Sequence, residues 1–259
     1  MIGVYDSGLG GVSVLRAIHA LLPQHDLHYL ADTAYFPYGP LPTATVRERA
    51  LVCVGALIAH GAELAVVACN TASSAALEPL RAHYPIPIVG VEPGIKPAVA
   101  VTRTRQIGVL ATGGTLQGER FSRLVQRYAS DVQVQTVPAP ALVEQVEAGR
   151  LATPDTHALL HEYLDPLIAA GVDTVVLGCT HFHFLSDTIR QILGESITLI
   201  DTSLPVARRT ADLAQQIASG TGRVQFFTTG DPAQISVALG HMWAGATVQP
   251  LEDMPRVPC

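Results

Sequence analysis

Cysteine, lysine, charged residues and long apolar runs are all scarce in this chain, and each scarcity excludes a class of protein. The four cysteines among the 259 residues are separated by 16, 110 and 80 positions and are Cys53, Cys69, Cys179 and Cys259. These gaps match neither a disulfide framework nor paired CxxC zinc knuckles. We therefore expect reduced thiols and a cytoplasmic protein.

Only 15% of the residues are charged, whereas 48% are hydrophobic, and this balance excludes a disordered or fibrous chain. The net charge of −6 disfavours nucleic acid as a partner, because a phosphate backbone is repelled by an acidic protein. One of the 16 basic residues is a lysine, Lys96, so chemistry that needs a lysine Schiff base has a single candidate.

The nearest approach to a membrane span is the run of residues 51–69, which His60, Gly61 and Glu63 interrupt. The two remaining apolar pieces are too short to cross a bilayer, where charged groups are strongly disfavoured. A buried helix, a turn and a buried strand explain the run better. Residues 1–6 lack the basic region of a signal peptide, so no membrane partner is expected.

Short β-rich apolar runs alternate with longer stretches of helical periodicity. Strands are predicted at residues 2–5, 28–31, 64–68, 86–90, 106–111, 132–137, 174–178, 197–200 and 223–228, and a helix is predicted at residues 45–60. This βαβα pattern predicts an α/β fold of parallel sheets covered by helices on both faces. In such folds ligands bind beyond the carboxyl ends of the strands.

The chain also contains an internal repeat. Residues 57–69 align with residues 167–179, 110 positions later, and residues 2–8 align with residues 107–113, 105 positions later. Shared composition is the alternative explanation, because apolar helices, glycine caps and valine-rich strands are common. Since the cysteines at the two strand ends coincide, we favour two similar α/β halves, which the length of the chain allows.

Cys69 and Cys179 would face one cleft from opposite sides if the two halves packed face to face. A two-base proton exchange requires one thiol on each side, and the two thiols must begin in unlike protonation states. Polar residues and an expected helix start follow each cysteine. Backbone N–H groups there can bind a carboxylate and favour a thiolate, whose free pKa is about 8.5. We interpret Cys53 and Cys259 as small buried hydrophobes.

Two further motifs have competing interpretations. Cys179, His181 and His183 form a C-x-H-x-H string that zinc could use, although no second cluster of cysteine and histidine is evident. Residues 6–11 form a glycine-rich turn after the first strand that suits an anion, but they match neither the dinucleotide fingerprint nor a P-loop. Asp6 could be a helix N-cap or could help to move a proton beside a thiol.

At these motifs the chain resembles glutamate racemases. The matching blocks follow the family order from residue 2 to about residue 203 and are residues 4–11, 31–33 with 37–39, 68–73, 91–94 and 177–181, and residues 226–232 are similar too. The resemblance implies two doubly wound, flavodoxin-like halves with the active site between them, residues 1–92 with 205–259 and residues 93–204. It also implies a cofactor-independent enzyme that interconverts L- and D-glutamate and supplies D-glutamate for peptidoglycan synthesis.

The resemblance assigns roles to individual residues by their matched positions. Cys69 is expected to act as the base on the D isomer, and Cys179 as the base on the L isomer. Asp6 and His181 are expected to assist the respective thiols, and Glu147 stands where the family has a further assisting carboxylate. The positions that match substrate contacts are Asp6, Ser7, Tyr38, Gly39, Asn70, Thr71, Thr115, Thr180 and His181.

Some features depart from the family pattern or leave alternatives open. Gln117 and Gly118 replace a frequent lysine and serine, and residues 138–140 lack a common cysteine. Racemases that use pyridoxal phosphate need a lysine, and Lys96 lies outside any catalytic motif, which favours the cofactor-free route. Because the residue spacing does not separate glutamate from aspartate, an aspartate or hydantoin racemase and a non-catalytic small-molecule binding protein are the alternatives. The oligomeric state, a homodimer included, is not determined.

Overall fold

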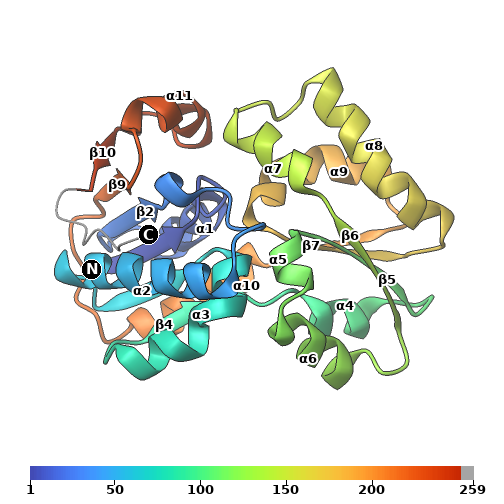
Figure 1. Cartoon of the computed structure of the whole chain (residues 1–259), viewed down its shortest axis with the longest axis horizontal. Helices are drawn as coiled ribbons and strands as arrows, with labels where there is room; N and C mark the ends of the chain where they lie inside the picture. Colours follow the sequence, from blue (N-terminus) through green and yellow to red (C-terminus); the bar gives the residue numbers. More distant parts are fainter. Residues whose placement is uncertain (252–259) are drawn as a thin grey trace.

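The computed structural model describes residues 1–251 and contains two parallel β-sheets, each with helices on both faces (Figure 1). The first sheet has the order β10-β9-β2-β1-β3-β4, with strands β1 (Ile2–Asp6), β2 (Leu27–Ala31), β3 (Leu64–Val67), β4 (Ile88–Gly90), β9 (Val224–Thr228) and β10 (Val248–Pro250). The second has the order β6-β5-β7-β8, with strands β5 (Gln106–Ala111), β6 (Gln133–Pro138), β7 (Thr174–Gly178) and β8 (Thr198–Ile200). The predicted fold class is confirmed.

Each strand predicted from the sequence overlaps an observed strand. The prediction succeeds because a parallel strand that is covered on both faces is a nearly continuous apolar run, and every residue of β1, β3 and β7 is buried. Strand β10 was not predicted. It has three residues, of which two are exposed, so it carries no such run.

The helices divide between the faces of the two sheets. In the first half, α1 (Val12–Leu21), α10 (Ser203–Ala214) and α11 (Pro232–Met242) cover one face, and α2 (Thr43–Ala59) and α3 (Asn70–His83) cover the other. In the second half, α4 (Ile95–Val101), α5 (Gly113–Leu116) and α6 (Glu119–Tyr128) lie opposite α7 (Pro140–Glu147), α8 (Pro154–Ala169) and α9 (Ser186–Leu193). The α1 face and the α7 face share one continuous apolar core, which joins the halves.

The internal repeat reappears in the topology and even in the strand register. The order β2-β1-β3-β4 in the first sheet corresponds to β6-β5-β7-β8 in the second, and all pairs are parallel. Ile2 pairs with Leu64, and the residues 105 and 110 positions later, Ile107 and Thr174, pair with each other. Two matching turns, at Gly61 and Gly171, both have positive φ, which glycine adopts without steric cost.

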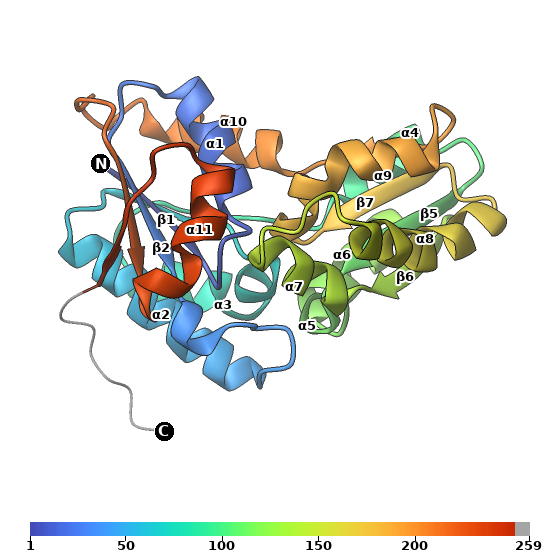
Figure 2. The ribbon, with the colours of Figure 1, turned by 90° about the horizontal axis from the view of Figure 1, so that it is seen from above.

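The chain passes twice between the two sheets, after β4 and after β8. Strand β9 then pairs with β2, and β10 pairs with β9, so the segment from residue 224 to residue 250 extends the first sheet. Figure 2 shows this returning segment on the side of the molecule that carries the N-terminus. Two short 3-10 helices, η1 (Thr33–Tyr35) and η2 (Thr180–Leu185), complete the elements. Across residues 1–251, no helix has both the length and the apolar character needed to cross a membrane.

Candidate active site

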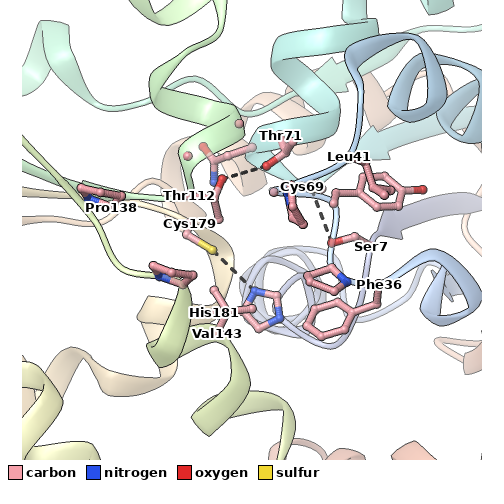
Figure 3. Close-up of a pocket in the computed structure, with 18 of the residues that line it drawn as sticks. Ser7, Phe36, Leu41, Cys69, Thr71, Thr112, Pro138, Val143, Cys179 and His181 are labelled. Atoms are coloured by element: carbon pink, nitrogen blue, oxygen red, sulfur yellow. Dashed lines mark hydrogen bonds between the residues drawn. The ribbon is translucent and has the colours of Figure 1, made fainter.

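A cavity of about 530 Å³ lies between the two halves, beyond the carboxyl ends of β1, β3, β5, β6 and β7 (Figure 3). The first half contributes Ser7, residues 36–41, Thr43, Cys69, Asn70 and Thr71, and the second contributes residues 112–114, Gln117, Gly118, Pro138, Pro140, Val143, Glu144 and residues 179–181. The cavity thus lies at the strand ends where ligands are expected to bind, and both Cys69 and Cys179 line it.

Cys69 lies between the end of β3 and the first residue of α3. Its sulfur accepts the backbone N–H of Ala72 at 3.4 Å and lies 3.7 Å from the hydroxyl of Ser7. Burial raises the pKa of the Cys69 thiol to about 12, the nearby Asp6 carboxylate adds to this effect, and the two hydrogen bonds only partly oppose it. Cys69 is therefore a neutral thiol at neutral pH.

Cys179 has a different neighbour. Its sulfur lies 3.5 Å from Nδ1 of His181, and Nε2 of His181 lies 2.6 Å from the carboxylate of Glu147. Burial alone would lower the pKa of His181, but the Cys179 sulfur and the Glu147 carboxylate outweigh burial and raise this pKa well above its ordinary value. A protonated imidazole is thus held between a carboxylate and the sulfur, an arrangement that stabilises a thiolate.

The glycine-rich turn brings the two halves close together at this point. The N–H of Leu9 donates to the Glu147 carboxylate at 2.6 Å. A Cβ atom at Gly8 would collide with that carboxylate, and one at Gly10 would collide with the ring of His181. The predicted anion of this turn is therefore a side chain of the protein itself, and of residues 6–11 only Ser7 lines the cavity.

Asp6 is fully buried at the end of β1 and does not line the cavity. It accepts hydrogen bonds from Ser7 Oγ at 3.2 Å, from the N–H of Gly8 at 3.1 Å and from Thr180 Oγ1 of the other half at 3.0 Å. Burial raises the pKa of Asp6, although His181 and the hydrogen bonds oppose the shift. The N-cap of α1 is Gly11, so Asp6 is not a helix cap. Ser7 lies between Asp6 and Cys69, and its hydroxyl contacts both the Asp6 carboxylate and the Cys69 sulfur.

The other predicted substrate contacts divide into those in the wall and those behind it. Ser7, Tyr38, Gly39, Asn70, Thr71, Thr180 and His181 line the cavity, whereas Asp6 and Thr115 do not. Glu147, which was expected as an assisting carboxylate and not as a substrate contact, does not line it either. Thr115 lies behind Thr112, 3.0 Å from its hydroxyl. The Asn70 amide is buried and has no hydrogen-bond partner within residues 1–251, so it is available to a ligand. The substrate roles of these residues stay predictions.

Several wall residues were not found by sequence reasoning. Thr112 lies 105 positions after Ser7, so the repeat itself could have identified it, and its hydroxyl bonds that of Thr71 across the two halves at 2.9 Å. Phe36 lies against His181 with ring centroids 6.0 Å apart (Figure 3). No local sequence signal marks Phe36, because its partner belongs to the other half.

The structure also places the remaining candidates. His183 pairs with Asp201 at 2.9 Å, and within the described part of the chain no three metal-binding side chains come together. Lys96 lies outside the cavity lining, with its ammonium 5.7 Å from the ring centre of Tyr128. Cys53 is buried within α2 away from the cavity, and Cys259 lies outside the described residues.

Comparison with known proteins gives concordant matches. The family model described as Asp/Glu/Hydantoin racemase matches residues 7–210. The glutamate racemase of Stutzerimonas stutzeri strain A1501 is 44% identical over 246 residues, which is 93% of each chain. The crystal structure of Escherichia coli glutamate racemase, in complex with L-glutamate and the activator UDP-MurNAc-ala, matches with a TM-score of 0.87 at 34% identity, covering 96% of this chain and 97% of that chain. The glutamate racemase isoform RacE1 of Bacillus anthracis matches with a TM-score of 0.86 at 31% identity, covering 100% and 98%.

Proposed function

Because this chain belongs to the Asp/Glu/Hydantoin racemase family, and is therefore a racemase, we propose that it interconverts L- and D-glutamate by proton exchange between Cys69 and Cys179 without a cofactor. The choice of glutamate is supported by the names of the relatives that match nearly the whole chain. The observation that carries the two-base mechanism is the pair of sulfurs, from equivalent strand ends, in one cavity.

Racemisation must remove a proton from the α-carbon, whose low acidity requires a positioned base, exclusion of water and donors to the carboxylate. With L-glutamate, the Cys179 thiolate takes the α-proton while the Cys69 thiol delivers a proton to the opposite face. His181 stabilises the thiolate before the transfer, and Glu147 holds the imidazole in the orientation that places Nδ1 toward the sulfur. The neutral Cys69 is ready to donate because burial disfavours its thiolate.

The reverse direction requires Cys69 to act as the base. Ser7 lies between the Cys69 sulfur and the Asp6 carboxylate, so it provides a hydrogen-bonded connection between the two. We assign Asp6 the role of an assisting carboxylate on this side. The hydrogen bond from Thr180 to Asp6 then links the surroundings of the two thiols.

Glutamate carries two carboxylates, and among residues 1–251 no arginine or lysine lines the cavity. Substrate binding therefore depends on neutral donors and on backbone N–H groups. The unpaired Asn70 amide and the N-terminus of α3, which starts at this residue, are suited to bind one carboxylate. Hydroxyl groups of Ser7, Thr71 and Thr180 are the other donors that we propose from the matched positions.

We further propose that residues 1–92 with 205–259 form one domain and residues 93–204 the other. Support comes from the pairing of β9 with β2 and from the packing of α10 against α1. The D-glutamate would supply peptidoglycan synthesis in the cytoplasm, as the resemblance implies. Expression of the chain in a bacterial strain that requires D-glutamate should remove that requirement, and failure of an active enzyme to do so would contradict the role.

The proposed reaction can be tested by proton exchange. In deuterium oxide, with no cofactor added, the purified protein should place deuterium on the α-carbon of L- and D-glutamate, as measured by NMR. Absence of exchange with every amino acid tested would leave only a binding function. Higher catalytic efficiency on aspartate than on glutamate would instead favour the aspartate racemase alternative.

The roles of the thiols predict the behaviour of single cysteine variants. Cys69→Ser and Cys179→Ser should each lose racemisation. An alcohol is far less acidic than a thiol, so a serine at either position does not replace the missing acid or base. Cys53→Ser is the matched control and should keep it, since Cys53 is outside the cavity lining. Full turnover by either of the first two variants would refute the mechanism.

A further inference from the structure

One continuous segment of the first half supplies a large share of the cavity wall. Residues 36–41 and Thr43 line the cavity, and Phe36 also covers His181 of the other half (Figure 3). The segment runs from η1 to the beginning of α2 and has no regular secondary structure between residues 36 and 42. Its position must therefore be held by contacts outside the segment itself.

Those contacts converge on Asp32, immediately before η1. The fully buried Asp32 carboxylate accepts two hydrogen bonds from the Arg49 guanidinium, at 2.9 Å and 2.8 Å, in the paired geometry that arginine forms with carboxylates. It also accepts the hydroxyl of Tyr38 at 2.5 Å and the hydroxyl of Thr229 at 2.7 Å. Arg49 is itself buried, in the second turn of α2.

The ion pair connects the two ends of the wall segment. Asp32 and Arg49 are 17 positions apart and flank residues 36–43. Their contact therefore holds the two ends of this segment at a fixed separation. The hydrogen bond from Thr229 to Asp32 links the start of the segment to the end of β9. A second link to β9 is the 2.6 Å hydrogen bond between the hydroxyls of Thr33 and Thr228. Neither Asp32 nor Arg49 lines the cavity.

A buried ion pair is a poor way to gain stability, because removing two charges from water offsets most of their attraction. Its geometry here is instead suited to specify one conformation of the wall. The Tyr38 hydroxyl illustrates the effect, since it is engaged by Asp32 and by Tyr5 at 2.6 Å, so that Tyr38 is held in place from behind the wall.

We propose that Asp32 and Arg49 are positioning residues that hold residues 36–43 in the conformation that binds substrate, and so set the affinity for it. The inference rests on the proposed function. When a binding-competent conformation is populated for only a fraction of the time, the apparent dissociation constant increases by the inverse of that fraction. Loosening the ion pair should therefore weaken binding and leave the proton transfers in the bound complex nearly unchanged.

The test uses the double variant Asp32→Asn/Arg49→Met, which removes both charges and avoids the unpaired buried charge that either single change would leave. We expect a folded protein in which the Kd for L-glutamate, from calorimetry, and the KM both increase about tenfold or more, while kcat changes less than about threefold. Arg47→Met is the matched control, because Arg47 is exposed on the same helix and does not line the cavity. It should leave Kd, KM and kcat unchanged.

A folded double variant with unchanged Kd and KM, or with reduced kcat at unchanged KM, would overturn the inference. Arg49→Lys covers the case in which the double variant does not fold, because it keeps the charge and loses the paired geometry. It should give an intermediate rise in Kd, and an unchanged Kd would likewise overturn the inference. If the wild-type protein bound L-glutamate but catalysed no α-proton exchange, the proposed function would be contradicted. The positioning role of Asp32 and Arg49 would then still be tested by the Kd values. Absence of binding by the wild type would overturn both.

Discussion

Cys69 and Cys179 occupy equivalent strand ends in the two halves, yet their surroundings differ in charge. Cys69 has an alanine N–H, a serine hydroxyl and, farther away, the Asp6 carboxylate. Cys179 has the imidazole of His181, which Glu147 supports from behind. The repeat thus places two identical groups on opposite sides of one cavity and gives them different neighbours. Burial and Asp6 raise the pKa of Cys69, whereas Cys179 lies beside an imidazole whose own pKa is raised.

This difference has a consequence for mechanism. Two identical environments would favour the same protonation state on both thiols, and a two-base exchange cannot start from that state. In the mechanism that we propose, the second half supplies the initial base and the first half supplies the initial acid, which suits L-glutamate as the first substrate. Four predictions test this comparison, in order of decreasing effect.

The largest effect is expected from His181→Gln, which removes the cation beside Cys179. Racemisation should fall about 10²- to 10⁴-fold, the range that a positioned acid or base contributes. Because the Cys179 step becomes limiting, the primary isotope effect should increase for L-glutamate deuterated at the α-carbon and decrease for the D isomer. The measurement is the initial rate with each labelled enantiomer.

Asp6→Asn is the counterpart on the Cys69 side. It should shift the isotope effects in the opposite sense, with the larger increase for labelled D-glutamate. If both variants changed the two isotope effects equally, the assignment of one assisting group to each thiol would be wrong.

A smaller difference should appear in the reactivity of the two thiols. Iodoacetamide reacts with thiolates, so at pH 7 it should label Cys179 at least about tenfold faster than Cys69, as followed by peptide mass spectrometry. Labelling of Cys69 should increase only as the pH rises toward its raised pKa of about 12. In His181→Gln, Cys179 should no longer be labelled faster than Cys69. Equal labelling rates of the two cysteines in the wild type would contradict the proposed difference between them.

The smallest effect concerns the stability of the fold at different pH values. The pKa of His181 is raised in the folded protein, so its proton stabilises the fold fully below the ordinary histidine pKa of about 6.5. This contribution is lost as the pH rises through the folded value. The free energy of unfolding of the wild type relative to His181→Gln, from urea titrations, should therefore decrease from pH 6 upward. A pH-independent difference would mean that folding leaves the pKa of His181 unchanged, and an increase with pH would mean that the fold favours the neutral imidazole.

Much of the fold could be predicted because its signals are local. A buried parallel strand is recognised from consecutive apolar residues, as in the fully buried run of Leu64–Val67. The repeated cysteine that follows this run marks the end of the strand. Strand β10 carries no such signal, because its pairing with β9 is made by the backbone and its side chains are mostly exposed.

The site could be predicted only in part. The two thiols, Ser7 and Asn70 lie within three residues of the ends of their strands, and they line the cavity as expected for residues at the carboxyl ends of strands. Thr115 matched a substrate contact by position, but it lies behind Thr112. Thr112 in the cavity wall and Thr115 behind it are about one helical turn apart, and a sequence motif does not show which of the two faces the cavity.

The sequence by itself determined that the chain has two related α/β halves with one thiol at the same strand end of each, because strand patterns and repeats depend on neighbours along the chain. Only the tertiary structure decided which charges surround each thiol. The contact of Glu147 with the Leu9 N–H joins residues 138 positions apart, and Asp32 meets Arg49 and Thr229 from three separate elements. Such contacts depend on how the halves and the returning segment pack, and burial together with the neighbouring charged groups shifts the pKa values of Cys69 and His181.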